Sequence, residues 1–341
     1  MIYRQPYEII TDDVFLSLPG LRPGCEVFLK LEGLNPTGSV KLKTAVSLVE
    51  DAERRGLLGP GSRIIESSSG NLGLALASIC AAKGYRFTCV VDPNTATSSS
   101  DQMRALGAEV VVVDWKDANG GYLESRISYI KTRLASQPGT VWLNQYANPA
   151  NPRAHYERTA RSILKELGQV DYLFVGTGSS GTFVGCAQYL REHSPATRIV
   201  AVDSAGSVIF GTPPGPRSIP GLGASRRPEL LRPELADEIL LVPELEAVRA
   251  CRRTAREHGL LVGGSTGSVL AAVLGYGPGF AAGSRIAAIS PDLGERYLRT
   301  IYDDAWVAER ITGAQDGPLT LDPFAPVPAL VPRPSAARVA V

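Results

Sequence analysis

Short runs of apolar residues, many of them β-branched, alternate along the chain with longer segments of helical periodicity. The apolar runs predict strands at Glu26–Leu31, Arg63–Glu66, Phe87–Val91, Val110–Asp114, Tyr172–Val175, Ile199–Asp203, Ile239–Val242 and Arg285–Ile289. The segments between them predict helices at Leu42–Arg55, Leu72–Lys83, Ser99–Leu106, Tyr122–Leu134, Arg153–Glu166, Thr182–Glu192, Leu245–His258 and Thr266–Leu274. This alternation predicts an α/β fold with mostly parallel, twisted sheets flanked by helices, in which ligands bind at the carboxyl ends of the strands.

The composition is that of a globular protein and excludes several classes of function. The chain has 341 residues, which is long enough for two domains. The net charge of +1 predicts no nucleic-acid partner and no membrane attraction, and no apolar run is long enough for a transmembrane helix. The first residues lack the apolar region of a signal peptide, so we expect a cytoplasmic protein. Scattered cysteines and only three histidines predict reduced thiols and no metal site.

Two segments without periodicity interrupt this pattern. Residues 206–228 are rich in Gly, Pro and Ser and predict a long ordered loop of the kind that often carries function. Residues 313–341 are rich in Pro and Ala and predict a mostly disordered tail.

A lysine stands at one of the predicted helix starts. Lys41 follows the turn-forming sequence NPTGSV. At this end of a helix the dipole disfavours an ammonium ion, and imine formation requires the neutral amine. A surface lysine after a turn is the alternative interpretation.

Three serine-rich loops, SSSGN at 67–71, GTGSSGT at 176–182 and GGSTG at 263–267, also lead into predicted helices. Backbone N–H groups and hydroxyls at a helix N-terminus bind carboxylates and phosphates, although serine caps with glycine turns produce similar sequences. A serine in the last loop would be able to face a ring nitrogen. Together with the lysine, these loops provide one candidate for each part of a pyridoxal 5'-phosphate (PLP) site.

A nicotinamide-dependent dehydrogenase is a rival interpretation of the second of these loops. Gly176, Gly178 and Gly181 fit the G-x-G-x-x-G pattern, and Asp203 ends the next predicted strand 22 positions later. This hypothesis leaves the lysine and the other two loops without a role, so we favour the PLP enzyme.

The motifs NPTGSVK, SSSGNLG, GTGSSGT, GGSTG and PDLGERYL occur in this order and resemble the cysteine synthase family of fold-type II PLP enzymes. The resemblance extends over residues 18–306 and implies a fold like that of the tryptophan synthase β subunit, with PLP between two domains. It implies a smaller mobile domain at 44–148 that carries the substrate carboxylate loop, and a larger PLP-binding domain at 11–43 and 149–312. It also implies a homodimer.

The resemblance assigns roles to residues at matching motif positions. Lys41 would form the Schiff base and act as the catalytic base, Asn71 would hydrogen-bond the ring hydroxyl, and Ser265 would face the pyridine nitrogen. The cofactor phosphate would be held by Gly178, Ser179, Ser180, Gly181 and Thr182. The α-carboxylate of an amino-acid substrate would be held by Ser68, Ser69, Gly70 and Gln145.

Several pocket positions depart from the common family pattern, among them Leu42-Lys43 in place of Asp-Arg and Tyr146 in place of Phe. The strings ESSSGNLGLALA, GGYLESRI, NQYANP and PGLGASRRPE resemble a branch of transferases (alkyl-transfer class EC 2.5.1) that joins O-phospho-L-serine and L-glutamate. That reaction gives N-(2-amino-2-carboxyethyl)-L-glutamate, a precursor of 2,3-diaminopropionate in siderophores and peptide antibiotics.

Phosphoserine carries a dianion, which requires cations or hydroxyl donors in the pocket. Tyr146 and Ser179 would supply hydroxyls and Arg126 a guanidinium, with a surface arginine as the alternative for Arg126. A cysteine synthase that uses sulfide with O-acetylserine or O-phosphoserine remains the alternative function, followed by a catalytically silent member of the fold.

Overall fold

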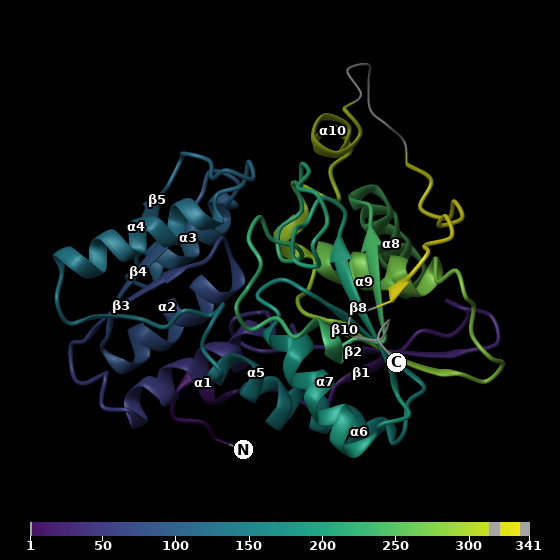
Figure 1. Ribbon diagram of the computed structural model, residues 1–341, viewed down its shortest axis with the longest axis horizontal. Coiled ribbons are helices and arrows are strands. Elements are labelled where there is room, and N and C mark those ends of the chain that lie inside the picture. The colour runs from purple at the N-terminus through teal and green to yellow at the C-terminus, as the bar shows by residue number, and fades with distance from the viewer. Residues whose placement is uncertain (1, 314–320, 335–341) are drawn as a thin grey trace.

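The computed structural model describes residues 2–313 and 321–334, which form two β-sheets with helices around them (Figure 1). The larger sheet has the order β1-β2-β10-β7-β8-β9-β11, and the smaller has the order β5-β4-β3-β6. All neighbouring strands are parallel except β1 with β2 and β11 with β9. The predicted α/β class with mostly parallel sheets is therefore confirmed.

The strands of the larger sheet are β1 Phe15–Ser17, β2 Glu26–Leu31, β7 Tyr172–Gly176, β8 Arg198–Ser204, β9 Glu238–Val242, β10 Arg285–Ser290 and β11 Arg333–Pro334. Those of the smaller sheet are β3 Arg63–Ser67, β4 Arg86–Val91, β5 Glu109–Val112 and β6 Thr140–Trp142. All eight predicted strands are present, and the short strands β1, β6 and β11 are additional.

The α-helices are α1 Lys41–Arg54, α2 Asn71–Lys83, α3 Thr97–Ala105, α4 Leu123–Ser136, α5 Ala150–Ala154, α6 Arg161–Leu167, α7 Gly181–His193, α8 Glu244–His258, α9 Gly264–Leu274 and α10 Asp304–Val307. Short 3₁₀ turns lie at Pro6–Glu8, Pro233–Leu235 and Glu295–Tyr297, and π-helical turns lie at His155–Ala160 and Ala308–Thr312. The predicted helix Arg153–Glu166 therefore consists of α5, a π-helical turn and α6.

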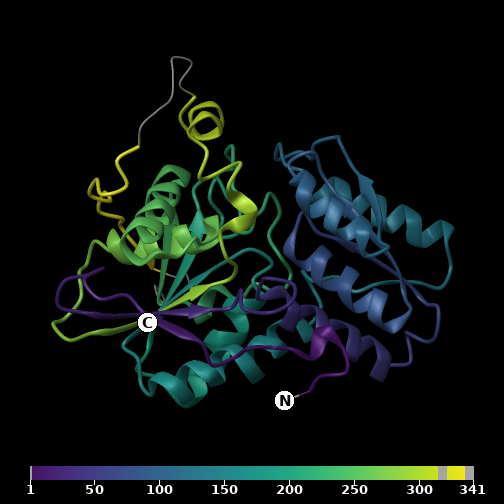
Figure 2. The ribbon, with the colours of Figure 1, turned by 180° about the vertical axis from the view of Figure 1, so that it is seen from behind.

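The two sheets lie side by side in two lobes, as both the front and the rear views show (Figures 1 and 2). The first turn of the chain, Pro6–Glu8, packs against α2 of the smaller lobe. The chain then forms β1 and β2 of the larger sheet, enters the smaller lobe through α1, and returns after β6. Helix α1 contacts both α2 and α5, so the lysine at its start belongs to the junction between the lobes. The exact division at residues 43/44 and 148/149 stays a prediction.

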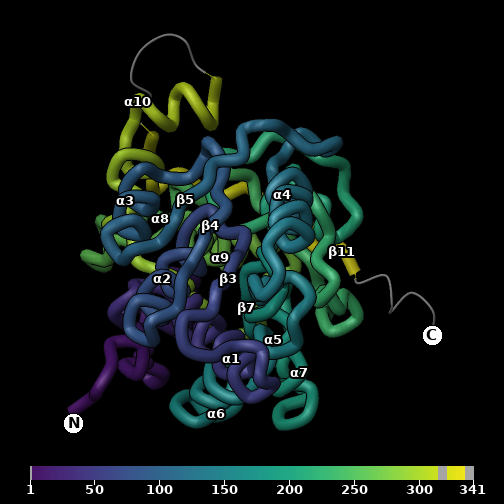
Figure 3. The backbone as a smooth tube through the Cα atoms, turned by 90° about the vertical axis from the view of Figure 1, so that its left-hand side faces the viewer, coloured from purple at the N-terminus to yellow at the C-terminus, as the bar shows by residue number. Residues whose placement is uncertain are grey.

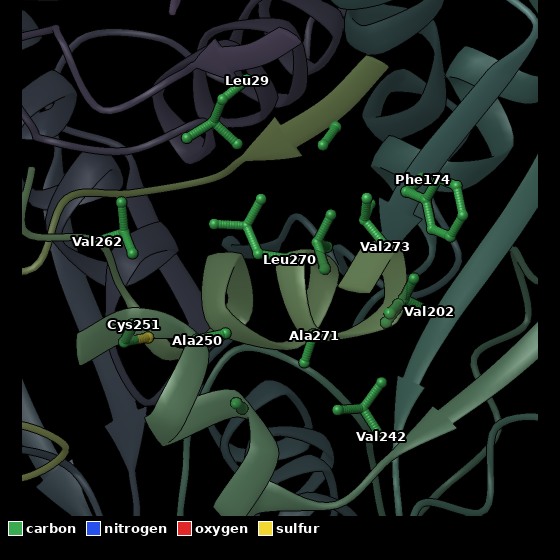
Figure 4. Packing of buried hydrophobic residues seen from close by; sticks show 14 of the residues in the cluster. Leu29, Phe174, Val202, Val242, Ala250, Cys251, Val262, Leu270, Ala271 and Val273 are labelled. Atoms are coloured by element: carbon green, nitrogen blue, oxygen red, sulfur yellow. The ribbon is translucent and has the colours of Figure 1, made fainter. Parts of the chain in front are cut away.

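The larger sheet is covered on both faces, which explains its nearly continuous apolar strands. Alternate residues of β7 and β8 belong to two different clusters: Phe174, Val200 and Val202 to one, and Leu173, Val175, Ile199 and Ala201 to the other. The first cluster surrounds α9, whose residues 264–273 are all buried between the sheet and α8 (Figure 4). A helix that is apolar on every side is stable only in such a position.

The predicted disordered tail is wrong for residues 321–334. Leu321 and Leu330 are buried in the core of the larger lobe, and Arg333 pairs with Ile239, so that β11 extends the sheet beyond β9. Figure 3 shows β11 near the edge of the molecule. Apolar side chains in this Pro-rich segment therefore pack against the lobe. The rest of that prediction, at residues 314–320 and 335–341, lies outside the described residues.

Among residues 2–313 and 321–334, no helix is both long and apolar enough to span a bilayer. Residues 206–228 contain no helix or strand, as expected, yet Ile209, Ile219 and Leu222 are buried. The predicted long, ordered loop is therefore confirmed.

Candidate active site

Three loops meet at residues 291–292, directly after β10. They are the lysine loop at 35–41, the asparagine loop at 67–71 and the serine loop at 263–267. The N–H of Val40 donates to the carbonyl oxygen of Pro291 at 2.7 Å, and the N–H of Gly263 donates to that of Asp292 at 3.3 Å. Asn71 Nδ2 donates to Asp292 Oδ2 at 2.7 Å. The ends of three segments that are distant in sequence are thus joined at one point.

The fourth loop, 176–182, reaches this point through Gly221. A Cβ at Gly221 would lie 2.4 Å from Ser265 Oγ, and a Cβ at Gly178 would lie 2.5 Å from the carbonyl oxygen of Gly221. Gly221 also has a φ of +104°, which L-residues rarely adopt. The long loop 206–228 therefore packs between Ser265 and the loop of Gly178, and only glycine fits at its point of contact.

Lys41 is the first residue of α1, where its backbone N–H lies 3.4 Å from Ser39 Oγ. Burial lowers the pKa of the Lys41 amine to about 8, and the nearby Asp292 carboxylate partly opposes this shift. About half of a group with this pKa is the neutral, nucleophilic amine near pH 8. The side chain therefore has the property that imine formation requires.

The loop before α7 has free donors of the kind that bind a phosphate. Ser180 caps the helix in a left-handed conformation with φ +68°, and its buried Oγ has no hydrogen-bond partner among the described residues. A Cβ at Gly181 would lie 2.0 Å from Asn151 Oδ1, so the backbone there is closely packed. Asn151 Nδ2 also donates to Ser179 Oγ at 3.2 Å. An unpaired hydroxyl and the N–H groups of a helix N-terminus fit an anion.

The predicted carboxylate loop surrounds the start of α2. Ser68 Oγ accepts from the N–H of Gly73 at 2.9 Å and from that of Gly70 at 3.3 Å, so this hydroxyl is already engaged in the turn. Ser69 is partly exposed, and a Cβ at Gly70 would meet nothing within 4 Å. Gln145 Nε2 donates to the carbonyl oxygen of Ser67 at 2.8 Å. The loop is therefore accessible to a ligand at its open side, Ser69 and Gly70. The side chain of Gln145 is held next to them by its hydrogen bond to Ser67.

Arg126 is buried on α4, which disagrees with a surface role. Its Nη1 lies 3.4 Å from Asp92 Oδ2, yet Nε and Nη1 have no hydrogen-bond partner among the described residues. The positive charge of Arg126 opposes the rise that burial causes in the pKa of Tyr146, so the two side chains are electrostatic neighbours. Asp92 supplies a counter-charge, but buried guanidinium N–H groups that make no hydrogen bond are costly unless a further acceptor binds them.

The structure brings to these loops four further polar residues for which the sequence predicts no role. Glu66 directly precedes the carboxylate loop, and Asp292, Arg296 and Tyr297 lie in the PDLGERYL motif. Arg296 Nη1 donates to Asn71 Oδ1 at 2.7 Å, and the Tyr297 hydroxyl donates to Asp292 Oδ2 at 2.5 Å. The PDLGERYL motif is recognisable in the sequence. Its side chains, however, contact residues that are distant in sequence, so no local pattern predicts these contacts.

Comparison with known proteins identifies the family. Residues 11–292 match the model of the family described as pyridoxal-phosphate dependent enzyme. The chain is 44% identical over 320 residues to the N-(2-amino-2-carboxyethyl)-L-glutamate synthase of Ralstonia nicotianae, covering 93% of this chain and 94% of the relative. It is 46% identical over 291 residues to the protein of the same name from Cupriavidus metallidurans, covering 84% of this chain and 85% of the relative.

Solved structures agree with this assignment. O-ureido-L-serine synthase superposes with a TM-score of 0.82 at 33% identity, covering 90% of this chain and all of that chain. The O-acetylserine dependent cystathionine beta-synthase from Helicobacter pylori gives a TM-score of 0.80 at 32% identity, over 88% of this chain and 98% of that one. The dehydrogenase alternative is therefore wrong, and the expected cofactor, PLP, is confirmed. The chain belongs to the pyridoxal-phosphate dependent enzymes, with the type II fold of the cysteine-synthase-like group.

Proposed function

We propose that this enzyme joins O-phospho-L-serine and L-glutamate by β-replacement, giving N-(2-amino-2-carboxyethyl)-L-glutamate and phosphate. The relatives with this name are 44% and 46% identical to the chain over 320 and 291 aligned residues. One observation at the site carries the proposal: the buried guanidinium of Arg126, beside Tyr146, has two nitrogen atoms without hydrogen-bond partners among the described residues. A substrate phosphate at this position would satisfy both.

The residues present fit the cofactor. Lys41 would bind its aldehyde carbon, and the unpaired hydroxyl of Ser180 with the backbone of Gly178–Thr182 would hold its phosphate. Ser265, packed against Gly221, would face the ring nitrogen, and Asn71 would face the ring oxygen. When bound, PLP supplies an electron sink that stabilises negative charge at the substrate α-carbon.

The side chains of this enzyme would then bind substrate and move protons. Ser69, the backbone of Ser68–Gly70, and Gln145 would hold the α-carboxylate, while Arg126, Tyr146 and Ser179 would hold the phosphate that leaves. The amine of Lys41 would remove the proton from the α-carbon and later return it to the same atom. Glutamate attacks through its α-amine, which first loses a proton, and the departing phosphate gains one, so the overall proton count balances.

The lobe of the smaller sheet would close over the substrate, which fits the smaller mobile domain expected at residues 44–148. Its loop at 117–121 already contacts the other lobe, because Asn119 Nδ2 donates to the carbonyl oxygen of Ser225 at 2.7 Å and Ser225 Oγ donates to Asp117 Oδ2 at 2.8 Å. Closure of this kind excludes water from the reacting atoms. We further propose that the enzyme acts in the cytoplasm as a homodimer and supplies a precursor of 2,3-diaminopropionate.

Product analysis tests the function. Purified enzyme loaded with PLP receives O-phospho-L-serine with either L-glutamate or sulfide, and a parallel series starts from O-acetyl-L-serine. Mass spectrometry should find the glutamate adduct and free phosphate, with little cysteine. Cysteine as the main product from either donor would instead identify a cysteine synthase, and no product from any combination would identify a silent member of the fold.

A further inference from the structure

The amide of Asn71 is held from both sides by residues of the other lobe. Its Nδ2 donates to Asp292 Oδ2 at 2.7 Å, and its Oδ1 accepts from Arg296 Nη1 at 2.7 Å. An amide turned by 180° would place its oxygen against a carboxylate and its N–H groups against a guanidinium. Both contacts would then be repulsive, so the charges on either side select a single orientation.

The two charged residues are themselves fixed. Arg296 Nη2 donates to the carbonyl oxygen of Thr37 at 2.6 Å, in the lysine loop. Asp292 is 3% exposed, and its Oδ2 also accepts from the Tyr297 hydroxyl at 2.5 Å. Its backbone is paired with Ser39 on one side and with Gly263 on the other. The orientation of Asn71 is therefore set by groups attached to the loops of Lys41 and Ser265.

The second N–H of the Asn71 amide is not taken by Asp292. The NH₂ group has two hydrogens, of which Asp292 accepts one, and the Tyr297 hydroxyl, itself bonded to Asp292, also interacts with the amide. A ring oxygen would compete with this hydroxyl for the second hydrogen. The bond from Arg296 to Oδ1 polarises the amide and strengthens the remaining N–H as a donor. This N–H belongs to the first residue of α2, beside the open side of the carboxylate loop.

We propose that Asp292 and Arg296 are positioning residues that make Asn71 a hydrogen-bond donor, and never an acceptor, toward the ring oxygen of the cofactor. A donor at this place favours the ionised ring oxygen, and an acceptor would favour the protonated hydroxyl. The inference rests on the proposed position of the cofactor ring beside Asn71, and it does not depend on which amino acids react.

The alternative is that the same contacts only connect the two lobes. A connecting role predicts effects on thermal stability and closure, without any effect on the electronic state of the cofactor. The absorbance spectrum of the loaded enzyme separates the two roles, because the forms with an ionised and a protonated ring oxygen absorb at different wavelengths. The dissociation constant of PLP, measured by titrating the apoprotein, provides a second readout that requires no catalysis.

The test compares D292A/R296M with N71A and with the combination of all three substitutions. We expect D292A/R296M to move absorbance from the band of the ionised ring oxygen to that of the protonated form and to weaken PLP binding about tenfold, as N71A does. Adding N71A to D292A/R296M should then change neither readout further, because both act through the same amide. This non-additivity also separates the effect from that of Asp292 on Lys41, which would persist without Asn71.

Arg252→Met serves as the control, because Arg252 is an arginine that is buried and ion-paired with Asp304, and it lies outside the site. It should leave both readouts unchanged. If D292A/R296M does not fold, the single variants D292N and R296M replace it in the same comparison. An unchanged spectrum and PLP affinity in folded variants would overturn the inference, as would full additivity with N71A. Neither result would bear on the choice of substrates, which product analysis decides.

Discussion

The buried carboxylate of Glu66 accepts a hydrogen bond from the backbone N–H of Gln145, 79 residues further along the chain, at 3.2 Å. The same carboxylate accepts from the N–H of Ser67 at 2.7 Å and from Trp142 Nε1 at 3.1 Å. All three partners are donors, and an ionised carboxylate is a group that only accepts. Glu66 therefore fastens the end of β3 to the segment after β6, and these two segments carry the predicted carboxylate site.

Replacing Glu66 with glutamine should damage substrate binding without removing the cofactor. Burial raises the pKa of Glu66 to about 7, so at pH 8.5 the carboxylate is mostly ionised. An amide would turn its own NH₂ toward at least one N–H donor, at a cost of about 1–3 kcal/mol, or roughly 5- to 150-fold in kcat/KM. Steady-state kinetics at pH 8.5 measure this. E53Q, which changes a carboxylate bonded to Lys83 and Tyr85, is the control, and equal kcat/KM values in both variants would refute the role.

Reconstitution of the apoprotein with PLP should depend on pH through Lys41. Burial lowers the pKa of Lys41 to about 8, and only the neutral amine attacks an aldehyde. The neutral fraction grows as the pH rises, so the rate should increase about tenfold per pH unit below 7 and become constant above about 8.5. Stopped-flow absorbance follows the imine. K41A should give no imine absorbance, and a rate that still rises roughly sevenfold between pH 9 and 10 would show that Lys41 has an ordinary pKa.

Removing the guanidinium of Arg126 should impair phosphoserine more than acetylserine. Charged hydrogen bonds of this kind contribute about 1.5–3 kcal/mol, so R126A should raise KM for O-phospho-L-serine roughly 10- to 100-fold. The matched control is R133A on the same helix, because that guanidinium lies 6.0 Å from the centroid of the Tyr129 ring and pairs weakly with Glu109. An equal loss with both amino-acid donors would place Arg126 outside the phosphate site.

The sequence predicted regular elements where the pattern was long enough. Strands such as β7 and β8 are buried on both faces and therefore read as apolar runs. Strands β1 and β6 have three residues each, which is too short for an alternating pattern to be recognised. In the tail, the Pro-rich composition outweighed the signal of Leu330, whose burial depends on tertiary packing.

The residues of the site also divide into those that local sequence predicts and those that only tertiary contacts bring together. The glycine and serine loops were recognisable because each lies at a strand–helix junction and has a characteristic composition. The bond between Asn71 and Asp292 joins residues 221 positions apart, and no local pattern specifies such a contact. Arg126 remained ambiguous for a related reason, because its burial depends on how α4 packs against the smaller sheet.

Residues 321–334 cover the edge of the larger sheet, and their removal should have two separate effects. Leu330 is buried, its N–H donates to the carbonyl oxygen of Gly275 at 2.6 Å, and Arg333 pairs with Ile239 in β9. Without this segment, Leu321 and Leu330 leave the core, which costs about 3 kcal/mol or more of unfolding free energy. The edge of β9 would also lose its neighbour, and unpaired edges promote association.

A chain that ends at residue 320 should therefore show a lower melting temperature and a concentration-dependent increase in size by light scattering. A chain that ends at Pro334 retains all of the contacts named above and serves as the control. Because these contacts lie at β9 and at the C-terminal end of α9, opposite the end that carries Ser265, both truncated enzymes should bind PLP with the affinity of the full chain. Equal melting temperatures for the two truncations would show that the segment contributes nothing to the fold. A loss of PLP binding in the shorter one alone would instead connect this edge of the sheet to the cofactor site.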